Sequence, residues 1–127
     1  MSARLEHMNI TVADLEATAA FLAAVFGWSV RWSGAAIANG YAVHVGDDAG
    51  YVALYRPGDG RTRDVAERYA ARGGLNHIGI VVEDLAAVEA RVVAAGYVPH
   101  SHADYEPGQR FYFEGPDAVE YEVVSYG

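Results

Sequence analysis

The feature that most constrains the fold of this chain is an internal repeat with a period of 70 residues. The segments LEHMNITVADLEATAAFLAA, beginning at Leu5, and LNHIGIVVEDLAAVEARVVA, beginning at Leu75, are identical at nine of twenty positions. Such self-similarity is typical of a duplicated structural unit. Each copy carries a histidine at its third position, His7 and His77. The repeat predicts two similar modules whose histidines converge across a pseudo-twofold axis, and two convergent imidazoles suggest a metal site.

Both copies of the repeat predict a strand followed by a helix. Residues 5–12 alternate between apolar and polar side chains, which is typical of a half-buried strand. Asp14 then stands at a helix N-cap position, an apolar stripe follows at helical spacing, and Gly27 ends the segment. The second copy has the same pattern, with Asp84 as the cap and Gly96 as the stop.

Three short β-rich segments follow each predicted helix, at 29–37, 41–45 and 51–55 and then at 98–102, 109–114 and 121–126. We therefore predict an α+β fold of two βαβββ modules in tandem, forming a curved, partly closed mixed sheet around a cleft with the helices outside. The expected organisation is a single domain over residues 1–127, with module one at about 5–56, a connector at about 56–74 and module two at about 75–126. Within the connector we expect a short helix over residues 62–72.

Composition excludes several classes of function. The formal net charge of −8 disfavours nucleic acid and anionic membrane surfaces as partners. The chain has no cysteine, so any metal must be held by histidine, aspartate or glutamate. The N-terminal residues lack an apolar secretory core, and no apolar run is long enough to span a bilayer. We therefore expect a cytoplasmic protein without a membrane partner.

Strand alternation also indicates where the polar chemistry lies. His7 and His77 fall on the polar faces of their strands, away from the apolar side chains that pack against the helices. In the last predicted strand Glu120 and Glu122 share one face. One of these two glutamates can therefore join the histidines.

Taken together, the paired modules, the strand-one histidines and the closing segment GPDAVEYEV, which is similar to the ending DPDGNxIEL, resemble the vicinal oxygen chelate superfamily. This superfamily contains glyoxalase I, extradiol dioxygenases, fosfomycin thiol transferases and bleomycin resistance proteins. The resemblance covers residues from about 5 to 126. The family's metal ligands are the strand-one residue and the closing-strand carboxylate of each module, which correspond here to His7, Ala53, His77 and Glu122. The resemblance thus implies one divalent ion (Fe2+, Mn2+, Zn2+, Ni2+ or Co2+) bound by His7, His77 and Glu122.

Ala53 breaks the symmetry of the expected ligand set. Glyoxalase I uses four protein ligands, whereas extradiol dioxygenases and fosfomycin transferases keep the His, His, Glu pattern found here. Three ligands on one side of a metal leave about three positions open, as in non-haem Fe(II) oxygenases. A substrate with two adjacent oxygens would then enter beside the last strand of module one, where we expect Tyr51, Ala53 and Tyr55 to line its pocket.

The extradiol dioxygenase signature runs from a histidine through an apolar-tyrosine pair and a proline turn to the ligand glutamate. Here the corresponding residues are His102, Phe111, Tyr112, Pro116 and Glu122. The resemblance implies that Tyr112 hydrogen-bonds a substrate oxygen and that His102 serves as an acid or base. His44 lies in the middle of a predicted strand, matches no family position and is left without a role.

Two classes of function follow from these patterns. The first is a divalent-metal enzyme acting on a small molecule with vicinal oxygens, by ring-opening dioxygenation or by lyase, isomerase or epimerase chemistry. The second is a metal-free binding protein of the bleomycin resistance kind, in which an acidic groove lined by aromatic side chains holds a cationic drug. The ligand set favours the first and the charge of −8 fits the second. The resemblance also implies a homodimer, with the exchange of modules between chains left open.

Overall fold

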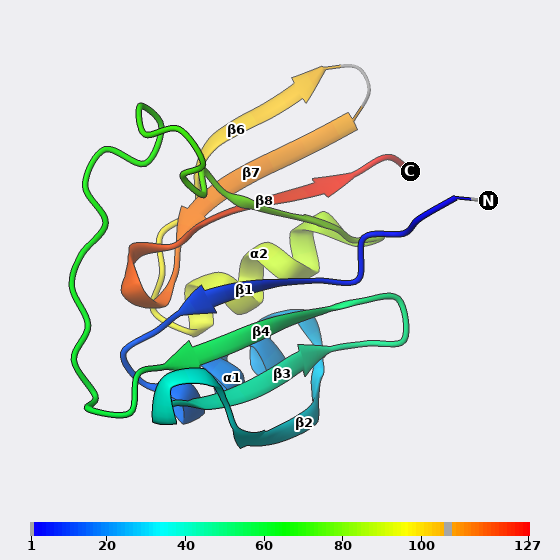
Figure 1. Cartoon of the computed structure of the whole chain (residues 1–127). Coiled ribbons are helices and arrows are strands. Elements are labelled where there is room, and N and C mark those ends of the chain that lie inside the picture. The colour runs from blue at the N-terminus through cyan, green and yellow to red at the C-terminus, as the bar shows by residue number, and fades with distance from the viewer. Residues whose placement is uncertain (1, 106–107) are drawn as a thin grey trace. The chain divides into compact units, whose positions relative to one another are not determined.

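A computed structural model describes residues 2–105 and 108–127 of the chain (Figure 1). The chain divides into two compact units, Met1–Arg63 and Asp64–Gly127. Each unit contains one helix and one four-stranded sheet, and the order strand, helix, strand, strand, strand occurs in both. The predicted α+β fold of two tandem βαβββ modules is confirmed, with neither sheet closed into a barrel.

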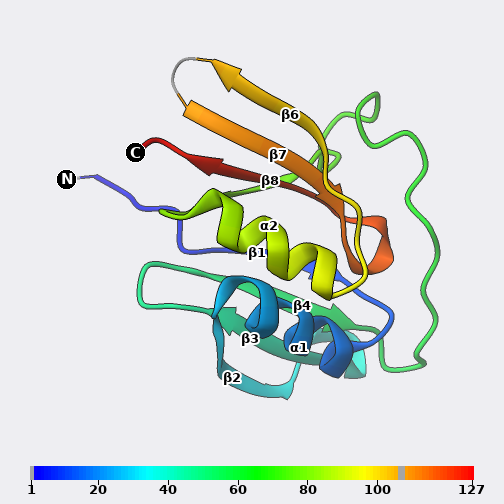
Figure 2. The same cartoon turned by 180° about the vertical axis from the view of Figure 1, so that it is seen from behind.

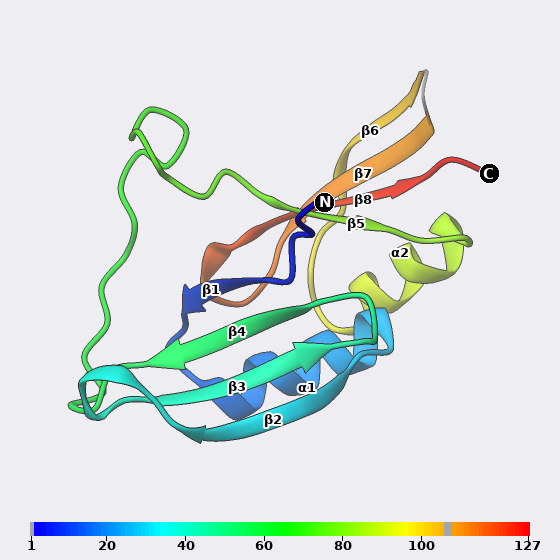
Figure 3. The same cartoon turned by 45° about the vertical axis from the view of Figure 1, so that its right-hand side comes forward.

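Module one contains β1 (His7–Thr11), α1 (Leu15–Phe26), β2 (Ser29–Ala35), β3 (Tyr41–Gly46) and β4 (Tyr51–Arg56). Its strands lie in the order β1-β4-β3-β2, with β1 parallel to β4 and the other pairs antiparallel. Helix α1 covers one face of this sheet, as Figures 2 and 3 show from two sides. The opposite face carries His7 and the other polar side chains of β1.

Helix α1 begins and ends where the sequence predicts. The Asp14 side chain accepts a hydrogen bond from the Ala17 backbone N–H at 3.0 Å, which satisfies an otherwise unpaired donor at the helix start. Gly27 takes the left-handed conformation, with φ of 73°, that ends a helix at low steric cost. Leu22 and Val25 are fully buried between the helix and the sheet.

Module two contains β5 (Ile78–Val81), α2 (Leu85–Ala94), β6 (His100–Tyr105), β7 (Gly108–Glu114) and β8 (Glu120–Ser125), in the sheet order β5-β8-β7-β6. Asp84 caps α2 through the Ala87 N–H at 3.0 Å, and Gly96 has a φ of 96° just beyond the helix end. The core includes the fully buried rings of Phe111 and Phe113. Neither α1 nor α2 has the length and apolar content that a membrane-crossing helix needs.

The predicted helix over residues 62–72 is wrong. This stretch of the connector, described throughout, is irregular over residues 62–67 and forms turns from residue 68, where the Ala70 and Ala71 N–H groups are both bonded to the Glu67 carbonyl. The two large apolar side chains of the stretch, Val65 and Tyr69, are both exposed. A helix of this length is marginal in water unless an apolar face packs against something. Here no such packing offsets the cost of ordering the chain.

Candidate functional site

The strand ladders define which residues of the two modules are equivalent. In module one Asn9 of β1 pairs with Ala53 of β4, and in module two Gly79 of β5 pairs with Glu122 of β8. Ala53 and Glu122 therefore occupy equivalent places, as the repeat predicts. Across the next ladder, Ala53 lies opposite His44 and Glu122 opposite Tyr112. This register makes His44 the counterpart of Tyr112 and Tyr51 the counterpart of Glu120.

His77 and Glu122 lie in contact in module two. The His77 Nε2 atom is 3.0 Å from Glu122 Oε1, and Arg110 Nη1 donates to the other carboxylate oxygen, Oε2, at 2.7 Å. The Arg110 and Glu122 side chains are only 12% and 13% exposed. The arginine therefore holds one oxygen of Glu122 while the second oxygen stays directed at the imidazole.

The other ring nitrogen of His77 has a carboxylate partner too. Glu120 Oε2 lies 3.2 Å from His77 Nδ1, so both glutamates of β8 contact this histidine. Tyr69 of the connector donates its hydroxyl hydrogen to Glu120, and its oxygen is 3.4 Å from His77 Nδ1. The hydrogen bond to Glu120 raises the pKa of Tyr69 to about 12. Tyr69 therefore remains a neutral donor at physiological pH.

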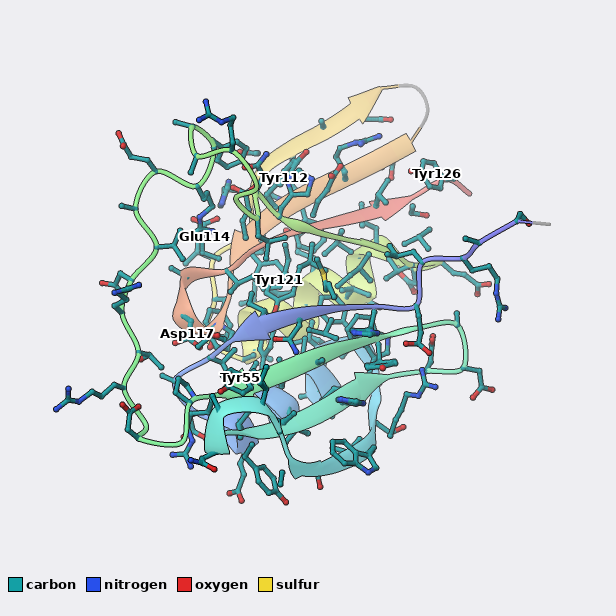
Figure 4. The ribbon with its side chains drawn as sticks, in the orientation of Figure 1. Tyr55, Tyr112, Glu114, Asp117, Tyr121 and Tyr126 are labelled. Atoms are coloured by element: carbon teal, nitrogen blue, oxygen red, sulfur yellow. The ribbon has the colours of Figure 1, made fainter. Side chains whose placement is uncertain are left out.

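Tyr112 lies beside this pair on β7. Its ring is 5.7 Å from that of His77 in an edge-to-face arrangement, and its backbone pairs with Glu122. Glu114, two residues along the same strand, contacts His100 Nε2 at 2.6 Å. Figure 4 labels both Tyr112 and Glu114 on this strand. Tyr112 thus lies next to His77 and Glu122, and its role toward a substrate remains a prediction.

His102 does not join this cluster. Its Nε2 atom is 2.9 Å from Glu89 of α2, and its ring stacks on the buried ring of Phe111 at 5.9 Å. Both contacts belong to the face of the sheet that α2 covers. The reason is a register shift in β6 between His100 and Ala103, where Ser101 has a φ of 56°. The resulting bulge breaks the alternation of side chains and turns His102 away from Tyr112.

In module one, His7 lies in a cluster of rings on the sheet face away from α1. Its Nδ1 atom is 2.7 Å from Glu6 Oε1, and the Tyr51 hydroxyl donates to the same oxygen at 3.2 Å. The Tyr51 ring stacks at 4.8 Å from the His7 ring and 4.5 Å from the His44 ring. The Arg31 guanidinium lies 4.7 Å above Tyr51. The hydrogen bonds from His7 and Tyr51 lower the pKa of Glu6, which keeps it ionised.

His44, to which the sequence pattern assigns no role, is a further candidate residue beside His7 and Tyr51. Partial burial, followed by the nearby positive charges of His7 and Arg31, lowers the pKa of His44 and favours the neutral imidazole. Trp32 packs against it, with the ring centres 4.9 Å apart. The signal that would have found His44 is its ladder position opposite Ala53, the equivalent of Tyr112 opposite Glu122.

The three residues expected to line a substrate pocket differ in what they present. Ala53 is 1% exposed, so its methyl group offers almost no surface to a ligand. The Tyr55 hydroxyl donates to the Ile37 carbonyl at 2.8 Å. Tyr51 faces His7 and His44. A cavity of about 930 Å³ in module one lies elsewhere, between α1 and the edge formed by β2 and β3.

Two of the three expected metal ligands, His77 and Glu122, are placed so that they could bind one divalent ion. Within residues 2–105 and 108–127, no group of three or more His, Asp or Glu side chains is arranged to hold one. His77 and Glu122 nevertheless supply one imidazole nitrogen and one carboxylate oxygen that converge within 3.0 Å. These are the atom types that Fe2+, Mn2+ and Zn2+ accept. The approach of His7 from module one remains a prediction.

Comparison with known proteins identifies the family. A family model described as the glyoxalase, bleomycin resistance protein and dioxygenase superfamily matches residues 6–113. No curated protein sequence matches the chain.

Solved structures share the fold at low sequence identity. A glyoxylase/bleomycin resistance protein/dioxygenase domain from Frankia sp. EAN1pec is 21% identical, with a TM-score of 0.83 over 100% of this chain and 94% of that one. The fosfomycin resistance protein FosX from Listeria monocytogenes, in complex with Mn(II) and sulfate, is 19% identical, with a TM-score of 0.74 over 98% and 93%. A glyoxalase I variant from Zea mays is 16% identical, with a TM-score of 0.79 over 95% of this chain and 44% of that one. Two βαβββ modules and the family match over residues 6–113 establish that this chain belongs to the glyoxalase, bleomycin resistance protein and dioxygenase superfamily, the vicinal oxygen chelate proteins.

Proposed function

We propose that His7, His77 and Glu122 bind one divalent metal ion and that the chain is a metal-dependent enzyme acting on a small molecule with two adjacent oxygens. The observation that carries this proposal is the convergence of His77 Nε2 and Glu122 Oε1 at 3.0 Å, with the second oxygen of Glu122 held by Arg110. A carboxylate held in this way has one oxygen directed at the place a metal would take. The Mn(II) in the Listeria protein supports a metal in this fold.

Each residue of the cluster has a distinct role in the proposed site. When bound, the metal would act as a Lewis acid that polarises the substrate oxygens. Tyr112, edge-on to His77, would donate a hydrogen bond to one of those oxygens. His44 holds the equivalent ladder position in module one, and its lowered pKa favours the neutral imidazole, which can accept a proton from a substrate. We infer that Tyr112 and His44 serve the substrate, and we leave His102 out because it contacts α2.

The reaction class is tested with the purified protein loaded with one metal at a time. Protein loaded anaerobically with Fe(II) is assayed with catechols and oxygen for ring-cleavage products, and Ni(II) or Zn(II) protein is assayed with methylglyoxal and glutathione. Glu122→Gln should lower turnover at least about 100-fold, because a direct ligand is lost. Glu114→Gln is the matched control, since Glu114 pairs with Glu120 across the β7–β8 ladder and contacts His100 instead. An absence of product in both assays would contradict dioxygenase and glyoxalase chemistry.

The second candidate is a metal-free drug-binding protein of the bleomycin resistance kind. The observation in its favour is the ring cluster of the half-buried Tyr51 and His44 and the exposed Trp32, beside the ionised carboxylate of Glu6. Aromatic faces next to a negative charge suit a planar cation. Calorimetric titration of the EDTA-treated protein with bleomycin distinguishes the two candidates. Tight binding that Tyr51→Ala abolishes would favour sequestration over catalysis.

A further inference from the structure

The two strand-one histidines have the same kind of partner on the same ring nitrogen. In module two His77 Nδ1 faces Glu120 at 3.2 Å, and Glu120 accepts a hydrogen bond from the Tyr69 hydroxyl. In module one His7 Nδ1 faces Glu6 at 2.7 Å, and Glu6 accepts from the Tyr51 hydroxyl at 3.2 Å. In each module, therefore, Nδ1 of the histidine contacts a carboxylate that also accepts a hydrogen bond from a tyrosine hydroxyl.

The duplication does not explain this likeness, because the partners occupy non-equivalent positions. Glu6 precedes its histidine directly, and the corresponding residue of module two is Asn76. Glu120 comes from β8, where the module-one counterpart is Tyr51. The tyrosine that holds Glu120 belongs to the connector. Two different sets of residues thus build one arrangement around the same atom.

The arrangement determines where a neutral imidazole carries its single proton. A carboxylate beside Nδ1 accepts a hydrogen bond from that nitrogen and favours the proton there. The lone pair of Nε2 is then available to a ligand. In module two Nε2 of His77 also faces a carboxylate, Glu122 at 3.0 Å, so the metal-free protein offers an acceptor to both ring nitrogens of His77. A metal ion that takes Nε2 would leave the ring proton on Nδ1, beside Glu120. Histidines that bind metals commonly donate their other N–H to a carboxylate, which fixes the ring and its tautomer.

We propose that Glu6 and Glu120 are positioning residues, which hold His7 and His77 with the proton on Nδ1 so that Nε2 of each ring is the metal-binding atom. This inference rests on the proposed function for its metal, but the proton position in His7 can be measured without one. The described part of the chain offers His7 Nε2 no hydrogen-bond partner, so Glu6 alone biases its tautomer.

The first test measures the tautomer of His7 in the metal-free protein. Long-range proton–nitrogen correlation spectra, recorded at about pH 8.5 so that imidazoles are neutral, distinguish the protonated from the bare ring nitrogen. We expect His7 to carry its proton mainly on Nδ1 and to shift toward Nε2 in Glu6→Gln. Glu6→Asp should restore part of the wild-type pattern. Asp48→Asn is the matched control. Asp48 borders the same surface hollow as Glu6, and its substitution removes the same charge without breaking a bond to His7.

The second test measures metal affinity by titration calorimetry with Zn(II). Glu6→Gln and Glu120→Gln should each weaken binding by roughly 10- to 100-fold, the effect typical of removing such a partner. Glu114→Gln controls for the loss of one charge near Glu120 and should bind as the wild type does. In the Zn(II) form both histidines should retain the proton on Nδ1.

The outcomes separate the two ideas. A His7 proton on Nε2 in the wild-type protein, or Zn(II) bound through Nδ1, would overturn the inference. The same holds if Glu6→Gln and Glu120→Gln bind Zn(II) as tightly as the controls. If the wild-type protein binds no metal, the proposed function is contradicted. If the His7 tautomer nevertheless changes in Glu6→Gln and not in Asp48→Asn, the positioning role of Glu6 is supported.

Discussion

Replacing Arg110 with methionine tests whether Glu122 is held as a buried charge. Arg110 donates to Glu122 at 2.7 Å, and both side chains are about nine-tenths buried. Breaking a fully buried pair by removing one partner costs roughly 3–5 kcal/mol, because a charge is left without compensation. His77 still contacts the other oxygen of Glu122 in the variant, so the lower part of this range applies. We expect Arg110→Met to lower the free energy of unfolding by about 3 kcal/mol.

The assay is urea denaturation of the metal-free protein, followed by circular dichroism. A double-mutant cycle with Glu122→Gln isolates the pairwise coupling, which should be about 2 kcal/mol because the second substitution removes the unpaired charge. Arg61→Met is the control, because the Arg61 backbone N–H donates to the Asp59 carboxylate at 2.9 Å and its guanidinium forms no ion pair with a described residue. A stability of Arg110→Met within about 0.5 kcal/mol of the wild type, or simple additivity of the two substitutions, would show that Glu122 does not depend on Arg110 as a buried charge.

Three further predictions concern the supporting structure. Asp14→Ala removes the cap of α1 and should cost about 1 kcal/mol, measured as a lower midpoint of thermal unfolding. Phe113→Ala empties a fully buried site and should cost roughly 3–5 kcal/mol in urea denaturation. The pKa of His44 is lowered in the folded state, so the unfolded chain takes up this proton first. The free energy of unfolding should therefore fall as the pH drops below about 6.5 and level off below the folded-state pKa of His44. His44→Asn should lack this pH dependence. Equal pH profiles for the wild type and His44→Asn would contradict the prediction.

Local signals explain why the modules could be predicted from the sequence. Helix α1 has a capping aspartate at Asp14 and a left-handed glycine at Gly27, and both act over a few residues. Because the second copy of the repeat has Asp84 at the same position, it predicts the start of α2 in the same way. The connector lacked such support. Its apolar side chains, Val65 and Tyr69, are exposed, so helical propensity alone did not produce a helix.

Parts of the site depend on contacts that no local pattern encodes. Strand alternation placed His7, His77, Glu120 and Glu122 on polar faces, but it could not choose between the glutamates, and both contact His77. The partnership of Tyr69 with Glu120 joins residues 51 positions apart.

His102 and His44 show two further limits of alternation. A bulge in β6 reversed the side-chain direction of His102, because one extra residue shifts the alternation. No local pattern pairs His44 with Ala53, and only the β3–β4 ladder places the two opposite each other.

Metal analysis of the purified protein tests whether His7, His77 and Glu122 bind one metal ion together. After expression with added Fe, Mn, Zn, Ni or Co, elemental analysis should find roughly one equivalent per chain of one of these metals. Each of His7→Gln, His77→Gln and Glu122→Gln should lose most of that metal, while Glu114→Gln retains it. A wild-type protein with less than about 0.1 equivalent of every metal, or a His7→Gln variant that retains it fully, would contradict the three-ligand site.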